Sequence, residues 1–270
     1  MNEVSRNQEA PRILRPASPA ILANPGWSSF PSGPVFPRIK RMKVLVIDIG
    51  GTHVKVLATG QKERREIPSG LKMTPARMVA EVRKLTKDWS YDAISIGYPG
   101  FVLRGRPVAE PHNLGRGWVG FDFRKAFGKP VKIINDAAMQ AFGSYRDGKM
   151  LFLGLGTGLG SCMVIDGIIE PMELAHLPYK KGTFEDYVGL RGMEERGKRR
   201  WRKEVRRVVE TLVAALEPTD VVLGGGNVKK LHKIPAGCRA GDNDNAFLGG
   251  FRLWHPAAGS SPSKRRPKSR

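Results

Sequence analysis

Apolar residues occur along this chain in short runs separated by turn-forming residues, and two stretches share one organisation. Residues 44–59, VLVIDIGGTHVKVLAT, place β-branched and aliphatic residues on both sides of a glycine-rich turn, a pattern that predicts a β-hairpin. Residues 150–167, MLFLGLGTGLGSCMVIDG, repeat the arrangement. Two similar hairpins predict a duplicated, two-lobed α/β protein.

Other segments have clear helical or extended patterns. Thr74 and Pro75 form a cap and first-turn pair before apolar residues at helical spacing, so we expect a helix towards Trp89. Short apolar runs at residues 93–97, 131–134 and 221–223 predict buried strands. Residues 194–216 form an amphipathic pattern typical of a long helix.

Three of the turns are rich in glycine, which lets backbone N–H groups approach an anion closely. The third follows the strand at residues 221–223 and leads into an expected helix start. None matches the Rossmann or Walker pattern. Each turn either binds phosphate or is an ordinary tight connection. The candidate phosphate-binding residues are Asp48, Gly50, Gly51, Thr52 and Lys55 at the first turn, Gly156, Thr157 and Gly158 at the second, and Gly224, Gly225 and Gly226 at the third.

Asn135 and Asp136 stand where the strand at residues 131–134 passes into a helix. A carboxylate there is rigidly held, and the helix dipole favours its ionised form. It would accept a proton from a hydroxyl that attacks phosphorus, while Asn135 offers donors and an acceptor to neighbouring hydroxyls. The alternative is a simple helix cap.

Two further acidic residues and a histidine follow the second hairpin. Glu173 and His176 are three residues apart, so on a helical turn both side chains would share one face, and Glu185 comes nine residues later. Two carboxylates and an imidazole suit a polyhydroxylated ligand. A surface pair is the alternative.

Composition narrows the class of protein. The chain has 270 residues with 40% hydrophobic content, enough for a sizeable core. Its two cysteines, Cys162 and Cys238, exclude a disulfide framework and a four-cysteine zinc site. No apolar run is long enough to span a bilayer, and no signal peptide is evident. We therefore expect a cytoplasmic protein.

The formal net charge of +21 is spread over tails and core. Residues 1–41 are proline-rich, and we expect them to be a disordered extension or the product of a misassigned start codon, with the domain beginning at Met42. Residues 255–270 form a basic tail that we also expect to be disordered. The core still keeps a large positive charge, which would attract nucleic acid, acidic membranes or inorganic polyphosphate.

Together these motifs resemble the ROK family of actin-like sugar kinases over residues 43–254. The resemblance is carried by DIGGT, LGTGLGS, GYPG at residues 97–100, NDAAMQA from Asn135, ELAH from Glu173, LGGG and NAFLGG. It implies an actin-like, ribonuclease H-like duplicated fold with a central cleft, and lobes at residues 42–136 and 137–254. The segment ELAHLPYKKGTFEDYVG looks like the polyphosphate glucokinase branch of that family.

The resemblance also implies an activity and its residues. A phosphoryl group from polyphosphate, ATP or both would pass to the C6 hydroxyl of glucose, with Asp136 as general base. The sugar would be bound by Asn135, Asp136, Glu173, His176 and Glu185. Mg²⁺ would be held by phosphate oxygens and water near Asp48 without a side-chain cluster.

The sequence departs from the family pattern at two points. Ala175 replaces the usual glycine of the E-x-G-H segment, and the family's cysteine cluster is absent, so we expect no structural zinc. A homodimer is expected from the resemblance. Basic residues of the helix at 194–216 either track polyphosphate or form a solvated face, and the loop at 110–118 either touches substrate or is an ordinary loop.

Two other functions remain open. One is an ATP-dependent hexose kinase of the same fold, acting on glucose, mannose or glucosamine. The other is a non-catalytic sugar sensor or nucleic-acid-binding protein, since ROK proteins include repressors. Those repressors carry an amino-terminal helix-turn-helix, whereas residues 1–41 are too proline-rich to form one, so we expect no specific nucleic acid binding.

Overall fold

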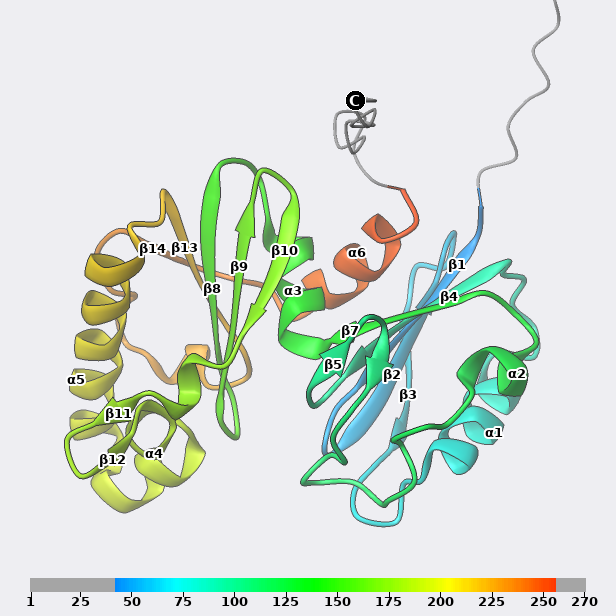
Figure 1. Ribbon diagram of the computed structural model, residues 1–270, viewed down its shortest axis with the longest axis horizontal. Coiled ribbons are helices and arrows are strands. Elements are labelled where there is room, and N and C mark those ends of the chain that lie inside the picture. Colours follow the sequence, from blue (N-terminus) through cyan, green and yellow to red (C-terminus); the bar gives the residue numbers. More distant parts are fainter. Residues whose placement is uncertain (1–41, 256–270) are drawn as a thin grey trace, which may run out of the picture. The chain divides into compact units, whose positions relative to one another are not determined.

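Two five-stranded sheets form the framework of the computed structural model, which describes residues 42–255 (Figure 1). The predictions for residues 1–41 and 256–270 lie outside this range. The first sheet has the order β3-β2-β1-β4-β7. Its strands are β1 (Val44–Ile49), β2 (His53–Ala58), β3 (Arg65–Pro68), β4 (Ala93–Tyr98) and β7 (Val131–Asn135).

The second sheet repeats this plan. Its order is β10-β9-β8-β13-β14. In both sheets the first three strands along the chain pair antiparallel, and a glycine turn joins the first to the second. The strands that come later in the chain then pair in parallel. This confirms the predicted duplication. The strands are β8 (Lys149–Leu155), β9 (Leu159–Ile165), β10 (Ile168–Met172), β13 (Asp220–Gly224) and β14 (Cys238–Ala240).

Six α-helices and several short elements complete the described chain. The helices are α1 (Pro75–Leu85), α2 (Phe123–Phe127), α3 (Asp136–Ser144), α4 (Phe184–Val188), α5 (Leu190–Leu216) and α6 (Asn245–Arg252). The short elements are the strands β5 (Val102–Leu103), β6 (Arg106–Pro107), β11 (Pro178–Tyr179) and β12 (Gly182–Thr183), and the 3₁₀ helices η1 (Leu174–His176) and η2 (Val228–Lys230).

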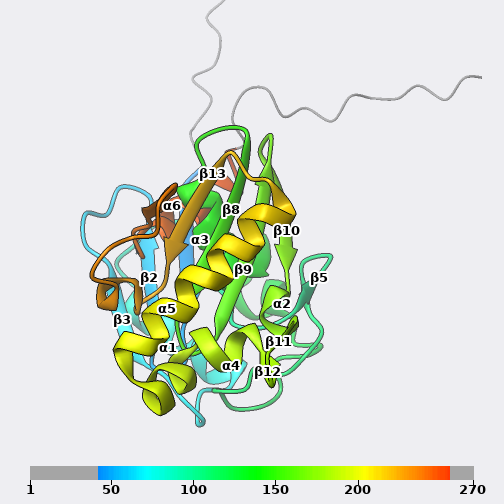
Figure 2. The same ribbon diagram turned by 90° about the vertical axis from the view of Figure 1, so that its left-hand side faces the viewer.

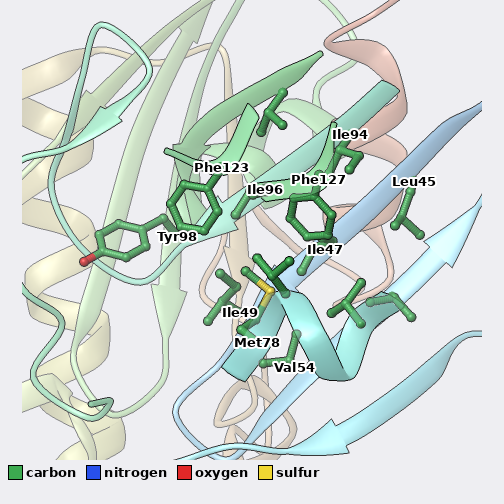
Figure 3. Close-up of a cluster of buried hydrophobic side chains, with 14 of the residues drawn as sticks. Leu45, Ile47, Ile49, Val54, Met78, Ile94, Ile96, Tyr98, Phe123 and Phe127 are labelled. Atoms are coloured by element: carbon green, nitrogen blue, oxygen red, sulfur yellow. The ribbon is translucent and has the colours of Figure 1, made fainter. Parts of the chain in front are cut away.

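Helices α1 and α2 cover one face of the first sheet (Figure 3). The expected cap of α1 is present, because the Thr74 side chain accepts a hydrogen bond from the backbone N–H of Arg77. Met78 and Val82 lie buried on the inner face of α1. Every residue of β1 is buried except Asp48, which is half-buried, so the strand is an apolar run with one acidic residue at its next-to-last position.

Helix α5 crosses the second sheet and packs its apolar stripe on β8 and β13 (Figure 2). It begins at Leu190, four residues before the predicted start, and its backbone is non-helical at Gly197. The helix expected after the third glycine turn is much shorter than predicted, because only the three-residue 3₁₀ helix η2 forms there. Too few amides are aligned in η2 to create a helix dipole of the predicted kind.

Helices α3 and α6 cross very closely. A Cβ atom at Gly143 would overlap the carbonyl oxygen of Asn245, and one at Gly249 would overlap that of Met139. Phe247 of α6 packs with Met139 and with Val46 of the first sheet, so α6 joins the end of the described chain to its beginning. The described residues fall in one compact unit, and the lobe boundary at residue 136 stays a prediction.

Across residues 42–255, no helix combines the length and apolar character that a membrane span requires.

Candidate active site

The carboxyl ends of β1, β4 and β7 meet at one edge of the first sheet. Asp48 pairs with Gly97, and Gly97 pairs with Ile134, so Asp48, the turn after Tyr98 and the start of α3 lie in adjacent positions (Figure 1). Ligands of α/β sheets bind at this kind of edge. The sheet therefore brings two of the predicted residues, Asp48 and Asp136, to one place.

The side chains of Asn135 and Asp136 have different roles at the start of α3. The Oδ1 atom of Asn135 accepts a hydrogen bond of 3.1 Å from the N–H of Ala138, so Asn135 is the helix cap. Its Nδ2 atom donates to the carbonyl of Gly100 over 3.1 Å. Asp136 Oδ1 accepts from the N–H of Ala137 at 2.8 Å, which orients the carboxyl. The cap interpretation thus belongs to Asn135 and leaves Asp136 available for chemistry.

The start of α3 is held between the two sheets by glycines. A Cβ at Gly97 of β4 would overlap the Met139 side chain. A Cβ at Gly160 of β9 would lie 2.8 Å from the Cβ of Ala137, closer than side chains normally approach. Both glycines let the helix approach its strands, and the Asp136 backbone is fixed from both sides.

The two aspartates have strongly altered acidity. Burial, and to a smaller extent the negative charge of Asp48, raises the pKa of Asp136 to about 7. Burial likewise raises the pKa of Asp48 to about 6, although the positive charges of Lys55 and Arg64 lower it. Such values near neutrality are typical of carboxyls that exchange protons at functional sites. The pair can hold or accept a proton in the physiological range.

The other predicted sugar-binding residues, beyond Asn135 and Asp136, lie in two places further along the chain. Glu173 directly precedes η1 and His176 is its last residue, with 3.8 Å between Oε2 and Nε2, and both side chains are largely exposed. The charge of Glu173 also contributes to the raised pKa of Asp136, which places it in electrostatic range of the start of α3. The i, i+3 arrangement predicted for Glu173 and His176 is therefore present, on a 3₁₀ turn.

Glu185 is bound to the second glycine turn. Its Oε2 atom accepts a hydrogen bond of 3.1 Å from the N–H of Leu159. A Cβ at Gly158 would overlap that same oxygen, so glycine is required there for Glu185 to reach the turn. This contact joins a predicted sugar-binding residue to a predicted phosphate-binding turn, and no local sequence pattern indicates it.

The second and third glycine turns are also joined. Asn227, a buried residue that the sequence analysis did not single out, donates from Nδ2 to the carbonyl of Gly156 at 2.8 Å, and its N–H donates to Leu155. Gly225 adopts a φ of +84° against the Leu155 backbone, a conformation that favours glycine. The only sequence signal for Asn227 is its place directly after three glycines.

A cavity of about 490 Å³ opens beside the third turn. It is lined by Gly225, Gly226, Val228, Lys229, Ala240, Gly241, Asp242 and Asn243. Of the other predicted phosphate-binding residues, Gly224 packs against Phe152, and the Thr157 carbonyl accepts from the N–H of Leu190. The cavity contains two of the predicted glycines and one lysine, while its one carboxylate, Asp242, accepts a hydrogen bond from the N–H of Asp244, so the lining can take an anionic or nucleotide group.

The first glycine turn is built differently. The N–H of Gly50 donates to the carbonyl of His53 at 2.9 Å, and the Thr52 hydroxyl lies 3.2 Å from Nδ1 of His53. Gly51 packs against the side chain of Asn113, from the irregular loop at residues 110–118. Lys55 stands opposite Asp48 on the neighbouring strand. The turn therefore lies directly beside the acidic edge.

A larger cavity of about 800 Å³ lies elsewhere, between the β5–β6 hairpin, α2 and β7. None of the predicted site residues lines it. We place the candidate site at the Asp48–Asp136 edge because that edge holds the two carboxyls with raised pKa values and adjoins the first glycine turn, whereas none of these residues lines the larger cavity.

Metal binding by side chains alone has little support in the described part of the chain. No group of three or more His, Cys, Asp or Glu residues is arranged for a metal ion within residues 42–255. Both cysteines are free, with Cys162 buried. Burial and the charges of Lys55 and Arg64 set the pKa of Asp48, with no hydrogen bond from a described residue among the causes, so its oxygens suit a hard cation that keeps most of its ligands from phosphate and water.

Comparisons with known proteins agree with this architecture. The ROK family model matches residues 44–171. A polyphosphate glucokinase from Mycobacterium tuberculosis is 27% identical over 209 residues, which cover 69% of this chain and 78% of the relative. The solved inorganic polyphosphate/ATP-glucomannokinase from Arthrobacter sp. strain KM superposes with a TM-score of 0.68 at 22% identity, covering 78% of this chain and 98% of that one.

A ROK family glucokinase from Streptomyces griseus, solved with glucose and AMPPNP, has a TM-score of 0.64 at 16% identity over 78% of this chain and 98% of its own. These structures share the duplicated fold, which is that of actin-like sugar kinases. In its motifs, its fold and its relatives, the chain is therefore similar to the ROK family of sugar kinases.

Proposed function

We propose that this protein is a sugar kinase that transfers a phosphoryl group to the C6 hydroxyl of glucose, with Asp136 as general base. The observation that carries the proposal is the position of Asp136, which is fixed by α3, has a pKa of about 7 and lies beside the first glycine turn. A base with a pKa near the working pH combines the correct protonation state with useful basicity.

The neighbouring residues would orient the hexose. The Asn135 amide donates one hydrogen bond to Gly100 and accepts one from Ala138. Its second N–H and the second lone pair of its oxygen are therefore left to bind hydroxyl groups of the sugar. Glu173, His176 and Glu185 would bind the other hydroxyls. Such positioning contributes much of the rate in phosphoryl transfer, because the attacking oxygen and phosphorus must be aligned.

Mg²⁺ fits this site through Asp48. A carboxylate without protein donors would bind the ion directly or through water, while the donor's phosphate oxygens supply the remaining ligands. The ion, when bound, neutralises charge on the transferred phosphoryl group. Lys55, opposite Asp48, would add a positive charge on the same side.

Polyphosphate is our proposed donor. Arg202 of α5 donates from Nε to the carbonyl of Lys230 at 2.8 Å, so α5 adjoins the short helix beside the 490 Å³ cavity. Arg199 and Arg206 lie three and four residues from Arg202, on the same helix face and exposed. A row of cations leading away from the third glycine turn suits a chain of phosphates. The Mycobacterium and Arthrobacter relatives, both named for polyphosphate use, favour the same donor.

ATP is the second candidate donor, because the cavity beside Gly225 and Gly226 has room for a nucleotide group and the Streptomyces relative was solved with AMPPNP. A homodimer, the absence of structural zinc and the absence of specific nucleic acid binding stay predictions. Size-exclusion chromatography with light scattering, metal analysis and filter binding would test them.

The experiment that tests the proposal is formation of glucose 6-phosphate with Mg²⁺ and either ATP or long-chain polyphosphate, at low and moderate salt. Mannose and glucosamine serve as alternative acceptors. We expect turnover with polyphosphate, and turnover with ATP alone would assign the α5 cations to a solvated surface. If neither donor phosphorylates any of these hexoses, the protein is not the kinase proposed.

A further inference from the structure

Arg64 joins two distant parts of the chain. It lies in the connection between β2 and β3, and its guanidinium forms an ion pair with the carboxylate of Asp244, which directly precedes α6. The two residues are 180 positions apart. Neither belongs to a motif that the sequence analysis identified, so the pair requires its own explanation.

Arg64 acts electrostatically on the acidic edge and, through Asp244, contacts the loop that lines the smaller cavity. On one side, its charge acts on Asp48, whose pKa it lowers together with Lys55 against the larger effect of burial. On the other side, its partner Asp244 follows Asp242 and Asn243, which line the cavity beside the third glycine turn. A donor that extends from Asp48 towards this cavity would pass the Arg64 guanidinium.

Arg65, the next residue, has the contacts of an arginine with a structural role and serves as a comparison. Arg65 forms two hydrogen bonds to Asp88, a third to the carbonyl of Leu85, and lies 4.3 Å from the ring centroid of Trp89. Arg64 has a single carboxylate partner, and the side chains of the pair are 44% and 60% exposed. An ion pair so open to water is easily exchanged for a stronger partner.

The loop that carries Asp244 does not depend on Arg64 for its position. Gln140 of α3 donates from Nε2 to the Asn243 side chain at 2.9 Å and to the Asp242 carbonyl at 3.3 Å. The N–H of Asp244 is bound by the Asp242 carboxylate at 2.9 Å. Since the loop is fixed from its own side, the Arg64 guanidinium is free to change partners without loss of the fold.

We propose that Arg64 is a donor-binding residue, which Asp244 holds in place until the phosphates of the donor replace the carboxylate. The inference rests on the proposed kinase function and specifies how that site receives its donor. A phosphate group is the stronger partner because it carries more charge and accepts two parallel hydrogen bonds from a guanidinium. Asp244 then competes with the donor for the Arg64 guanidinium.

The test compares four variants for the Michaelis constants of donor and hexose, turnover and melting temperature. Arg64→Ala should raise the donor KM at least tenfold, with the hexose KM and melting temperature unchanged. Asp244→Asn should leave donor binding as tight or make it a few-fold tighter, because the competing carboxylate is gone. Lys62→Ala is the matched control, since Lys62 is exposed in the same connection, and it should behave as the wild type.

The double variant Arg64→Asp with Asp244→Arg separates a structural role from a binding role. It rebuilds the ion pair in the opposite direction, so a purely structural contact would be rescued. Our proposal expects a donor KM at least as poor as that of Arg64→Ala. Rescue by the exchanged pair, a normal donor KM in Arg64→Ala, or weakened donor binding in Asp244→Asn would each overturn it.

Calorimetric titration with tripolyphosphate and with AMPPNP, both in Mg²⁺, measures donor binding without turnover, so it tests the role of Arg64 separately from the kinase activity. If the wild type binds either donor but phosphorylates no hexose, the kinase function fails while the Arg64 variants still decide the binding role. If the wild type binds neither compound, the Arg64 proposal fails as well.

Discussion

The charge of Asp48, at the end of β1, raises the pKa of Asp136, at the start of α3, in addition to the larger effect of burial. Asp48 lies in β1 and Asp136 directly follows β7, and since both strands pair in parallel with β4, the register of the sheet sets the two carboxyls at one edge. Because they interact, they titrate as a pair, with pKa values of about 6 and about 7.

The first prediction concerns the pH dependence of the reaction. A general base acts only when deprotonated, so kcat/KM for the hexose should fall as the pH drops below about 7, the value for Asp136. Asp48→Asn removes the neighbouring negative charge and should move this acid limb to lower pH, whatever its effect on the maximum rate. Rate profiles from pH 5 to 9 measure both, and an unchanged limb in the variant would show that Asp48 does not influence the base.

The second prediction concerns stability. The folded-state pKa of Asp136 lies above the ordinary value of ~3.9. The folded protein therefore holds its proton more tightly than the unfolded chain does, and the ionised carboxyl costs stability as the pH rises from about 4 to about 7. Asp136→Asn, which can still accept from Ala137, should be more stable than the wild type at pH 8 by about 1–2 kcal/mol, or ~3–6 °C.

The same comparison at pH 4.5 is the control for that stability effect. There the wild-type carboxyl is mostly protonated in the folded state, so the two melting temperatures should nearly coincide. Thermal melts followed by circular dichroism measure the difference, and an equal gap at both pH values would contradict the assigned ionisation.

The third prediction concerns the crossing of α3 and α6. Gly249→Ala would force a Cβ atom against the Met139 carbonyl and should destabilise the protein by about 2–3 kcal/mol. Leu248→Ala is the matched control, because Leu248 is the preceding residue and is 42% exposed, and a surface change typically stays within ~0.5 kcal/mol. Urea unfolding of both variants decides, and equal midpoints would argue against a close crossing.

The fourth prediction separates the two donors. Reversing the charges of Arg199 and Arg206 to glutamate should raise the KM for long-chain polyphosphate at least tenfold at low salt and leave that for ATP within about twofold. Arg83 and Lys84, exposed near the end of α1, provide a control with the same change in net charge. Equal effects of both double variants on polyphosphate would mean that only the overall charge matters.

Much of the fold could be predicted from the sequence because its signals are local. The hairpin at residues 44–59, the cap at Thr74 and the junction at Asn135 each depend on residues within a few positions of one another. The break at Gly197 and the short η2 were not predicted, since packing against the second sheet decides how far these helices extend.

Less of the site could be predicted from the sequence, because the site depends on contacts between residues that are distant in the chain. The type and order of the candidate residues indicated phosphate and sugar binding, but contacts between distant residues carried no local signal. Three such contacts form only when the two sheets and their turns are assembled: Glu185 with the turn at Gly158, Asn227 with Gly156, and Arg64 with Asp244. The residue roles themselves stay predictions until they are measured.

The measurement that tests the central claim most directly is turnover of Asp136→Asn in the glucose 6-phosphate assay, together with glucose binding by calorimetry. The account predicts a loss of kcat of ~10²–10⁴-fold with glucose affinity and fold retained, because the variant keeps the shape of the side chain and lacks the base. Turnover equal to that of the wild type would contradict Asp136 as the base.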